Sequence, residues 1–229
     1  MKSELIDFLK SLGASKIRIG NLEGHLPEHL KDLKTGISFC IRLQDRVIEE
    51  IEDKPTFTYF HHYRSVNSLI DHISLRGAMF LQDKGYDCYP IPASQSIRDK
   101  SYYYSGIFQH RTAATRSGLG WIGKNNCLVT KEFGPRIRLG TILTDAVFEY
   151  DEPINESLCG DCMVCVDSCP ALALKGENWK VGMDRELITD PKACSDHMSH
   201  HYKDIGRGVV CGICINRCPF GKKKKKINT

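Results

Sequence analysis

The stretch LCGDCMVCVDSCP, from Leu158 to Pro170, contains four cysteines in the spacing Cys-x2-Cys-x2-Cys-x3-Cys-Pro. Three thiolates spaced by two residues can wrap one 4Fe-4S cubane. The fourth thiolate, displaced by three residues and followed by proline, ligates a neighbouring cluster. The stretch therefore predicts two clusters, with Cys159, Cys162 and Cys165 on one of them and Cys169 on the other.

A second cysteine run supplies the remaining ligands. It has Cys194 and then Cys211-x2-Cys214-x3-Cys218-Pro219, so an insertion has moved its first cysteine upstream. If the last cysteine of each run crosses to the other cluster, Cys218 completes the first cluster. By the same exchange, Cys194, Cys211, Cys214 and Cys169 hold the second.

Zinc is the alternative metal, because Cys-x2-Cys pairs also form tetrahedral thiolate sites. A third cysteine at x2 and two Cys-Pro endings have no purpose in such a site, so we favour iron–sulfur clusters. His197, His200 and His201 follow Cys194 and are interpreted as surface or hydrogen-bonding residues. Gly160 and Gly212 are expected to let backbone N–H groups approach the cluster sulfurs.

The other three of the eleven cysteines, Cys40, Cys88 and Cys127, are scattered over the first two thirds of the chain. An odd number of cysteines without an export signal argues against a disulfide framework and for a reducing compartment. We interpret these three as small buried apolar residues. The sequence shows no apolar run near 20 residues, so we expect a cytoplasmic protein without a membrane partner.

The charge of the chain gives weak evidence for a nucleic-acid partner. The formal net charge is +4 over 229 residues, but two oxidised clusters with their thiolates would each add about −2 and cancel it. Part of the positive charge lies in the run from Lys222 to Lys226, which we interpret as a solvated tail, with contact to RNA or an acidic partner as the alternative.

Residues 1–150 alternate helical and strand-like patterns. We expect helices over residues 3–12, 59–84 and 111–117, and strands over residues 16–20, 37–43, 87–91, 126–130 and 136–144. This order predicts a sandwich of α/β or α+β type in which helices cover a central sheet. After Asp145 the chain becomes rich in Cys, Gly and Pro, and metal must supply the stability that a small apolar core cannot.

One block before the cysteine runs resembles a known family. The residues are RTAATRSGLGWIGKN, Arg111 to Asn125, then RLGTILTD, Arg138 to Asp145, then the double cysteine run. In this order they resemble the epoxyqueuosine reductases, which are similar to the corrinoid reductive dehalogenases. The resemblance extends from about Lys84 to Phe220.

The resemblance implies a fold and a second cofactor. The fold class is α+β: a nitroreductase-like α/β sandwich over residues 1–150 that binds a corrinoid, followed by a bacterial ferredoxin-like double 4Fe-4S domain over residues 151–229. Electrons would pass through the clusters to a cobalamin. The expected corrinoid-binding residues are Gly118, Gly120, Trp121, Gly123, Lys124 and Arg138. Taken alone, the glycine-rich block is also typical of a tight turn.

A tyrosine stands where the family has its acid. Epoxyqueuosine reductases have a carboxylate about fourteen residues before the Gly-Leu-Gly, whereas this chain has Tyr104, beside Tyr102 and Tyr103. A phenol can donate a proton, and the dehalogenases are thought to use a tyrosine in this way. We therefore predict Tyr104 as the catalytic acid, with His110 or Arg111 as the nearby cation. An aromatic patch is the alternative interpretation.

Three functions follow from these residues. The first is a cobalamin-dependent iron–sulfur reductase that takes electrons from a low-potential donor of ferredoxin or flavodoxin type and reduces an unidentified small molecule. The second is a non-catalytic electron carrier or corrinoid reactivase that serves a corrinoid-protein partner. The third is an epoxyqueuosine reductase that acts on tRNA. That family continues into a helical-repeat region that helps to hold tRNA, whereas eleven residues follow Cys218 here, so we expect tRNA recognition to come from elsewhere.

Overall fold

The computed structural model describes residues 1–95, 97, 104–205 and 210–222. At its centre is a four-stranded antiparallel sheet in the order β1-β2-β6-β3. The strands are β1 (Lys16–Asn21), β2 (Thr35–Arg42), β6 (Ile137–Thr144) and β3 (Cys88–Ile91). The two longest strands, β2 and β6, pair along their whole lengths, from Thr35 opposite Thr144 to Arg42 opposite Ile137.

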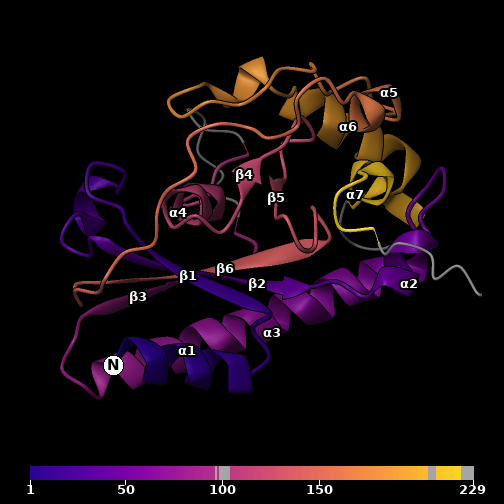
Figure 1. Cartoon of the computed structure of the whole chain (residues 1–229). Coiled ribbons are helices and arrows are strands. Elements are labelled where there is room, and N and C mark those ends of the chain that lie inside the picture. Colours follow the sequence, from indigo (N-terminus) through magenta and orange to yellow (C-terminus); the bar gives the residue numbers. More distant parts are fainter. Residues whose placement is uncertain (96, 98–103, 206–209, 223–229) are drawn as a thin grey trace, which may run out of the picture.

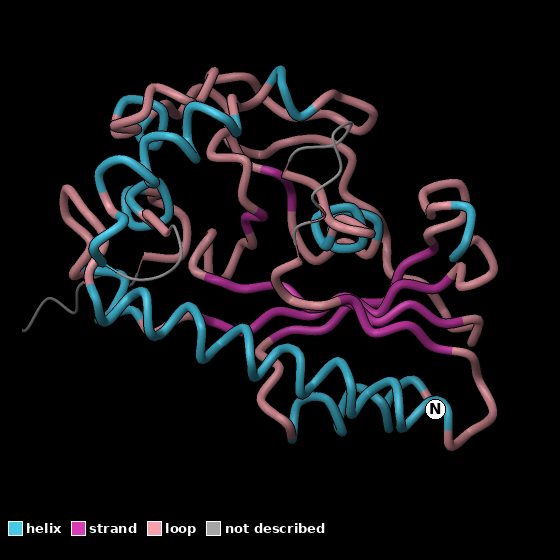
Figure 2. The backbone as a smooth tube through the Cα atoms, turned by 180° about the vertical axis from the view of Figure 1, so that it is seen from behind, coloured by secondary structure: helices cyan, strands magenta, loops and turns pink. Residues whose placement is uncertain are grey.

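Two helices cover one face of this sheet (Figures 1 and 2). They are α1 (Lys2–Ser11) and the 26-residue α3 (Phe57–Gln82). Thr56 caps the start of α3, because its side chain accepts a hydrogen bond from Tyr59 N at 3.0 Å. The core lies between these helices and the strands, and Leu9, Ile70 and Ile142 are fully buried in it. Gly77 on α3 permits this approach, because a Cβ there would lie 2.5 Å from the Ile142 side chain.

The opposite face of the sheet carries α4 (His110–Arg116) and the β-hairpin of β4 (Trp121–Ile122) and β5 (Leu128–Val129) (Figure 1). Above them lies the cysteine-rich part, with short helices α5 (Val164–Asp167), α6 (Pro191–His201) and α7 (Ile213–Arg217). The remaining elements are α2 (Asp45–Glu49) and three 3-10 turns, Glu28–Leu30, Arg185–Leu187 and Lys203–Ile205.

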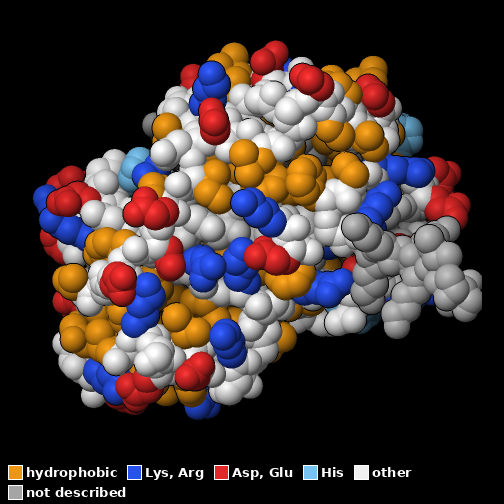
Figure 3. All heavy atoms as spheres, viewed as in Figure 1, with side chains coloured by type: hydrophobic (Ala, Val, Ile, Leu, Met, Phe, Trp, Pro, Cys, Tyr) orange, Lys and Arg blue, Asp and Glu red, His pale blue; other side chains and the backbone are white. Residues whose placement is uncertain are grey.

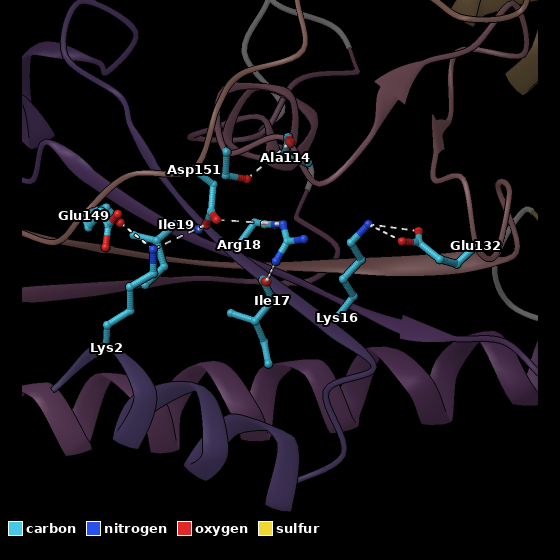
Figure 4. Close-up of polar contacts among 10 residues, drawn as sticks. Lys2, Lys16, Ile17, Arg18, Ile19, Ala114, Glu132, Glu149 and Asp151 are labelled. Atoms are coloured by element: carbon cyan, nitrogen blue, oxygen red, sulfur yellow. Dashed lines mark hydrogen bonds and ion pairs between the residues drawn. The ribbon is translucent and has the colours of Figure 1, made fainter.

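The segment that leads into the cysteine-rich part is fastened to the sheet (Figure 4). Asp151 accepts a hydrogen bond from Ile19 N at 2.8 Å and donates its own N–H to Ile19 O at 2.8 Å. Lys2 donates to Glu149 O at 2.6 Å. Close to α4, a Cβ on Gly118 would lie 2.1 Å from Glu152 O. The two parts of the chain are therefore packed together without a loose linker.

Most of the expected elements are confirmed to within a few residues, and the mixed α/β architecture with a central sheet is confirmed as well. The expected strand over residues 126–130 is shorter, because the backbone turns at Asn126, which has a φ of 56°. Tyr102, Tyr103 and the lysines after Lys222 fall outside the described residues. Among the helices described, none is long and apolar enough to cross a membrane.

Candidate cluster and cofactor site

The first group of cysteines converges on one small cavity. Cys159, Cys162, Cys165 and Cys218 all line it. Cys165 lies on α5 and Cys218 caps the C-terminus of α7, and these two helices pack together. The four are the residues predicted for the first cluster, including the one that crosses from the other run. As a ligand set they stay a prediction.

The chemistry of these thiols suits an iron–sulfur cluster. Without metal, burial and the neighbouring thiols raise the pKa of Cys165 to about 12 and that of Cys218 to about 11. Thiolates crowded in this way need a cationic centre between them, and ligated iron ions meet that need. In the described part of the chain, no three His, Cys, Asp or Glu side chains lie close enough to hold a single metal ion.

The second group gathers between α6 and α7. Burial is the main reason that the pKa of Cys194 rises to about 11, and the nearby Cys211 and Cys169 add to it. Cys194 lies in the first turns of α6, where Asp190 caps the helix by accepting a hydrogen bond from Ala193 N at 2.9 Å. The three histidines of α6 pack on one another and on Tyr202, as the surface interpretation expected.

Cys127 differs from its interpretation as a small buried apolar residue. It is half-buried and makes a hydrogen-bonding contact with Cys214. This contact is the main cause that lowers the pKa of Cys127 to about 7, with Arg111 and Arg138 contributing. Its sequence position between Asn126 and Leu128 gives no sign of this contact, because Cys214 is 87 residues away.

Cys127 belongs to the turn between β4 and β5, residues 123–127, which we name the hairpin turn. Gly123 N donates to Cys127 O at 2.9 Å, and Cys127 N donates to Asn125 Oδ1 at 3.1 Å. Arg111, on α4, donates to both the backbone and the side-chain oxygen of Asn126. The hairpin turn is therefore closed on itself and anchored to α4.

Two adjoining cavities lie on the other side of the hairpin turn. The smaller has a volume of about 420 Å³ and the larger about 1250 Å³. Both are lined by Tyr104, Ser105, Gln109, Arg111 and Asn126. Drug-sized ligands occupy pockets of roughly 300–1,000 Å³, so the combined space suits a larger ligand.

Tyr104 lies at the junction of these cavities, with a φ of 64° and a side chain that is 42% exposed. Arg185 donates to its backbone carbonyl at 2.9 Å. His110 cannot be its cation, because burial lowers the pKa of His110 to about 4 and leaves the ring neutral. Arg111 lines both cavities and keeps its charge over the physiological pH range.

A second phenol, which the sequence reasoning missed, lines the smaller cavity. Tyr63 on α3 accepts a hydrogen bond from Arg138 Nη2 at 3.1 Å, and the guanidinium lies 4.2 Å from the centre of its ring. Burial opposes ionisation, yet the Arg138 charge and several hydrogen bonds lower the pKa of Tyr63 overall. Only the spacing of Tyr63 and Asn67 on one helix could have indicated this arrangement, since Asn67 also binds Arg138, at 2.9 Å.

The six residues expected to bind a corrinoid are divided by the structure. Arg138 lines the smaller cavity. Gly118 and Gly120 pack against backbone carbonyls, since a Cβ on Gly120 would lie 2.3 Å from Val129 O, and Trp121 is buried with its edge on Phe220. Gly123 and Lys124 face the first cysteine cavity. Within the glycine-rich stretch from Gly118 to Lys124, Ile122 lines the larger cavity. The corrinoid roles stay predictions.

Comparison with known proteins connects this geometry to named relatives. Residues 158–221 match the family described as a 4Fe-4S double cluster binding domain. An epoxyqueuosine reductase of Listeria monocytogenes is 34% identical over 131 residues, which are 55% of this chain and 33% of that protein. The chain resembles the epoxyqueuosine reductases, as its sequence predicted.

Solved structures show the same fold over 96% of the chain. One is an epoxyqueuosine reductase with a tRNA-Tyr epoxyqueuosine-modified stem loop, with a TM-score of 0.64 and 20% identity, of which the match covers 65%. Another is a catabolic reductive dehalogenase in complex with 3-bromo-4-hydroxybenzoic acid, with a TM-score of 0.73 and 18% identity, of which the match covers 31%. This chain matches only about a third of the length of the Listeria reductase.

Proposed function

We propose that this chain is a two-cluster iron–sulfur oxidoreductase of the epoxyqueuosine reductase type. One observation carries the proposal: the hairpin turn has Lys124 and Asn125 in the first cysteine cavity and Asn126 in both large cavities. A few covalently linked residues thus separate an electron-storing centre from a space large enough for cofactor and substrate. Such a short separation suits electron transfer from one to the other.

The two parts of the chain would divide these tasks. Residues 1–150 form a nitroreductase-like sandwich that contributes most of the cavity lining, and residues 151–229 form the ferredoxin-like two-cluster domain. The second cluster, on Cys169, Cys194, Cys211 and Cys214, would also border the smaller cavity, because Cys214 contacts Cys127, which lines it. Electrons from a ferredoxin or flavodoxin type of donor in the cytoplasm would pass through the clusters to this space.

The adjoining cavities fit a corrinoid in size and lining. The larger has about 1250 Å³ bordered by Ile122, Trp179 and Met183, and the smaller offers Arg138 and Asn126 as hydrogen-bonding partners. When bound, cobalamin would supply a low-valent cobalt that delivers electrons to the substrate. Gly118, Gly120, Trp121, Gly123 and Lys124 would support the wall between cofactor and cluster.

A reductive step also needs a proton. Tyr104 reaches both cavities, and Tyr63 holds its hydroxyl beside Arg138 in the smaller one. General acids contribute on the order of 10²- to 10⁴-fold in rate. We propose Tyr104 as the donor, in the place of the family's carboxylate, and Tyr63 as the competing candidate.

The substrate would be epoxyqueuosine in tRNA. The names of the relatives support this choice, and Arg116, Arg185 and Lys192 around the larger cavity offer cations for a phosphate backbone. On the face shown in Figure 3, basic side chains are interspersed with acidic ones. We therefore expect the tRNA to contact the residues around the larger cavity and not a broad basic surface.

The test uses anaerobically purified and reconstituted full-length chain. We expect about eight iron and eight sulfide per chain, a cobalamin spectrum that changes on binding at tens of micromolar, and conversion of epoxyqueuosine in tRNA with a chemical reductant. Clusters and corrinoid binding without turnover would favour the corrinoid reactivase. Clusters without corrinoid binding would favour the electron carrier, and either result would overturn the proposal.

Two substitutions separate the candidate acids. Tyr104→Phe should slow turnover by about 10²- to 10⁴-fold at unchanged cluster content and cobalamin affinity. Tyr63→Phe is the matched variant, and we expect a smaller effect from it. The reverse order would transfer the role to Tyr63.

A further inference from the structure

The ammonium group of Lys124 is buried and has no carboxylate partner among the residues that the structure describes. Only 4% of the residue is exposed, and its Nζ lies 3.5 Å from the thioether sulfur of Met163. A thioether is a weak acceptor that carries no charge. Over the described residues, no ion pair to Lys124 is present. A buried cation in this state needs an anion nearby.

The adjacent Asn125 has a buried donor in the same cavity. The residue is 5% exposed, and its Oδ1 accepts a hydrogen bond from Cys127 N at 3.1 Å, which fixes the orientation of the amide. Its Nδ2 has no hydrogen-bond partner in the described part of the chain. Buried amide donors in folded proteins almost always have partners, so this one indicates a missing acceptor.

Both side chains line the cavity of Cys159, Cys162, Cys165 and Cys218. The backbone also comes close, since a Cβ on Gly123 would lie 3.6 Å from Cys159 Sγ. Four thiolates with a 4Fe-4S core carry a charge of about −2 when oxidised and accept hydrogen bonds through their sulfurs. One such cluster would supply both the anion that Lys124 needs and the acceptor that Asn125 needs.

We propose that Lys124 and Asn125 are positioning residues for the first cluster, where they set its reduction potential. The inference rests on the two-cluster part of the proposed function and on neither the corrinoid nor the tRNA. On reduction by dithionite the cluster gains one electron, no bond forms or breaks, and its charge goes from about −2 to −3. A nearby ammonium and an N–H donor stabilise the more negative state, so both raise the potential.

The experiment is an EPR-monitored redox titration of the reconstituted chain with dithionite. Lys124→Gln and Asn125→Leu should each lower the midpoint of one cluster by about 59 mV, which is a tenfold change in the reduced-to-oxidised ratio for a one-electron couple. The shifted signal should be the one that disappears in Cys218→Ala. Lys124→Arg, which keeps the charge, should restore most of the potential, and Lys131→Met at an exposed position should have no effect.

The outcomes separate this inference from the proposed function. Wild-type chain without 4Fe-4S signals would overturn both. Two normal clusters whose midpoints do not change in Lys124→Gln and Asn125→Leu would overturn the inference and leave the proposed function intact. If Lys124→Gln fails to hold clusters, the other two variants decide. An unchanged midpoint potential in Asn125→Leu would overturn the role of Asn125. A midpoint potential in Lys124→Arg that stays near the wild-type value would support the role of the Lys124 charge.

Discussion

The part of the molecule around the sheet and the cysteine-rich part are held together by different forces. Around the sheet, aliphatic side chains such as Leu9, Ile70 and Ile142 are completely buried between helices and strands. Among the described residues from Leu158 to Gly221 the buried side chains are few: Cys165, Ala173, Trp179, Ile188, Thr189, Tyr202, Val210, Ile213 and Cys218. Apolar burial therefore stabilises the first part, whereas the second depends on bonds between thiolates and iron.

Removal of iron should produce the largest difference between the two parts. Under anaerobic chelation we expect the cysteine-rich part to lose its order, because the metal bonds replace a core there, while the sheet and α3 stay folded. Hydrogen exchange followed by mass spectrometry would show rapid exchange over residues 158–205 and slow exchange in α3 and β2. Equal protection of both parts before and after chelation would contradict the idea.

Single ligand substitutions should remove one cluster each. Cys218→Ala should leave about four of eight irons and spare the second cluster, and Cys169→Ala should spare the first, because each ligand is assigned to the cluster of the other run. Iron analysis with EPR measures this effect. Cys88→Ala, at a free thiol on β3, serves as the control and should keep all eight irons. Loss of the cluster of its own run in either variant would disprove the exchange.

A cavity in the apolar core should lower the stability of the part around the sheet and leave the clusters unchanged. Ile70→Ala removes a fully buried side chain from α3, so the free energy of unfolding of the sheet region should fall by about 2–5 kcal/mol. Denaturant titration measures this quantity in the holo-protein. The adjacent Leu69→Ala, at a side chain that is 38% exposed, should cost much less. Similar losses from both variants would argue against a core at this position.

The helix cap should have the smallest effect. Thr56→Ala removes the acceptor for Tyr59 N at the start of α3, with an expected loss of about 1 kcal/mol in the free energy of unfolding. The same denaturant titration measures it. Ser65→Ala is the matched control, since Ser65 lies inside the helix and its hydroxyl donates to His61 O. A larger loss from Ser65→Ala would show that the cap is not what stabilises α3.

The acid that the sequence proposed shows where sequence reasoning stops. The distance of Tyr104 from the Gly-Leu-Gly motif predicts it as the acid, and it lies at the junction of the two cavities. His110 is close to Tyr104 in sequence, but burial lowers the pKa of its ring to about 4 and it does not supply the cation. Arg138, far away in sequence, makes the cation–phenol pair with Tyr63. Sequence proximity does not determine which charges meet, because the sheet and helix bring distant residues together.

Local sequence patterns are sufficient to predict the helices, the strands and the cysteine spacing of the two runs. Helical and strand periods are local properties, and a cubane needs ligands at fixed short spacings, so both are visible within a few residues. The folded chain is needed to see that Lys124 faces a cysteine cavity, that Cys127 contacts Cys214, and that two cavities meet at Tyr104. Burial and charge pairing depend on contacts between segments far apart in the chain, and no local pattern encodes such contacts.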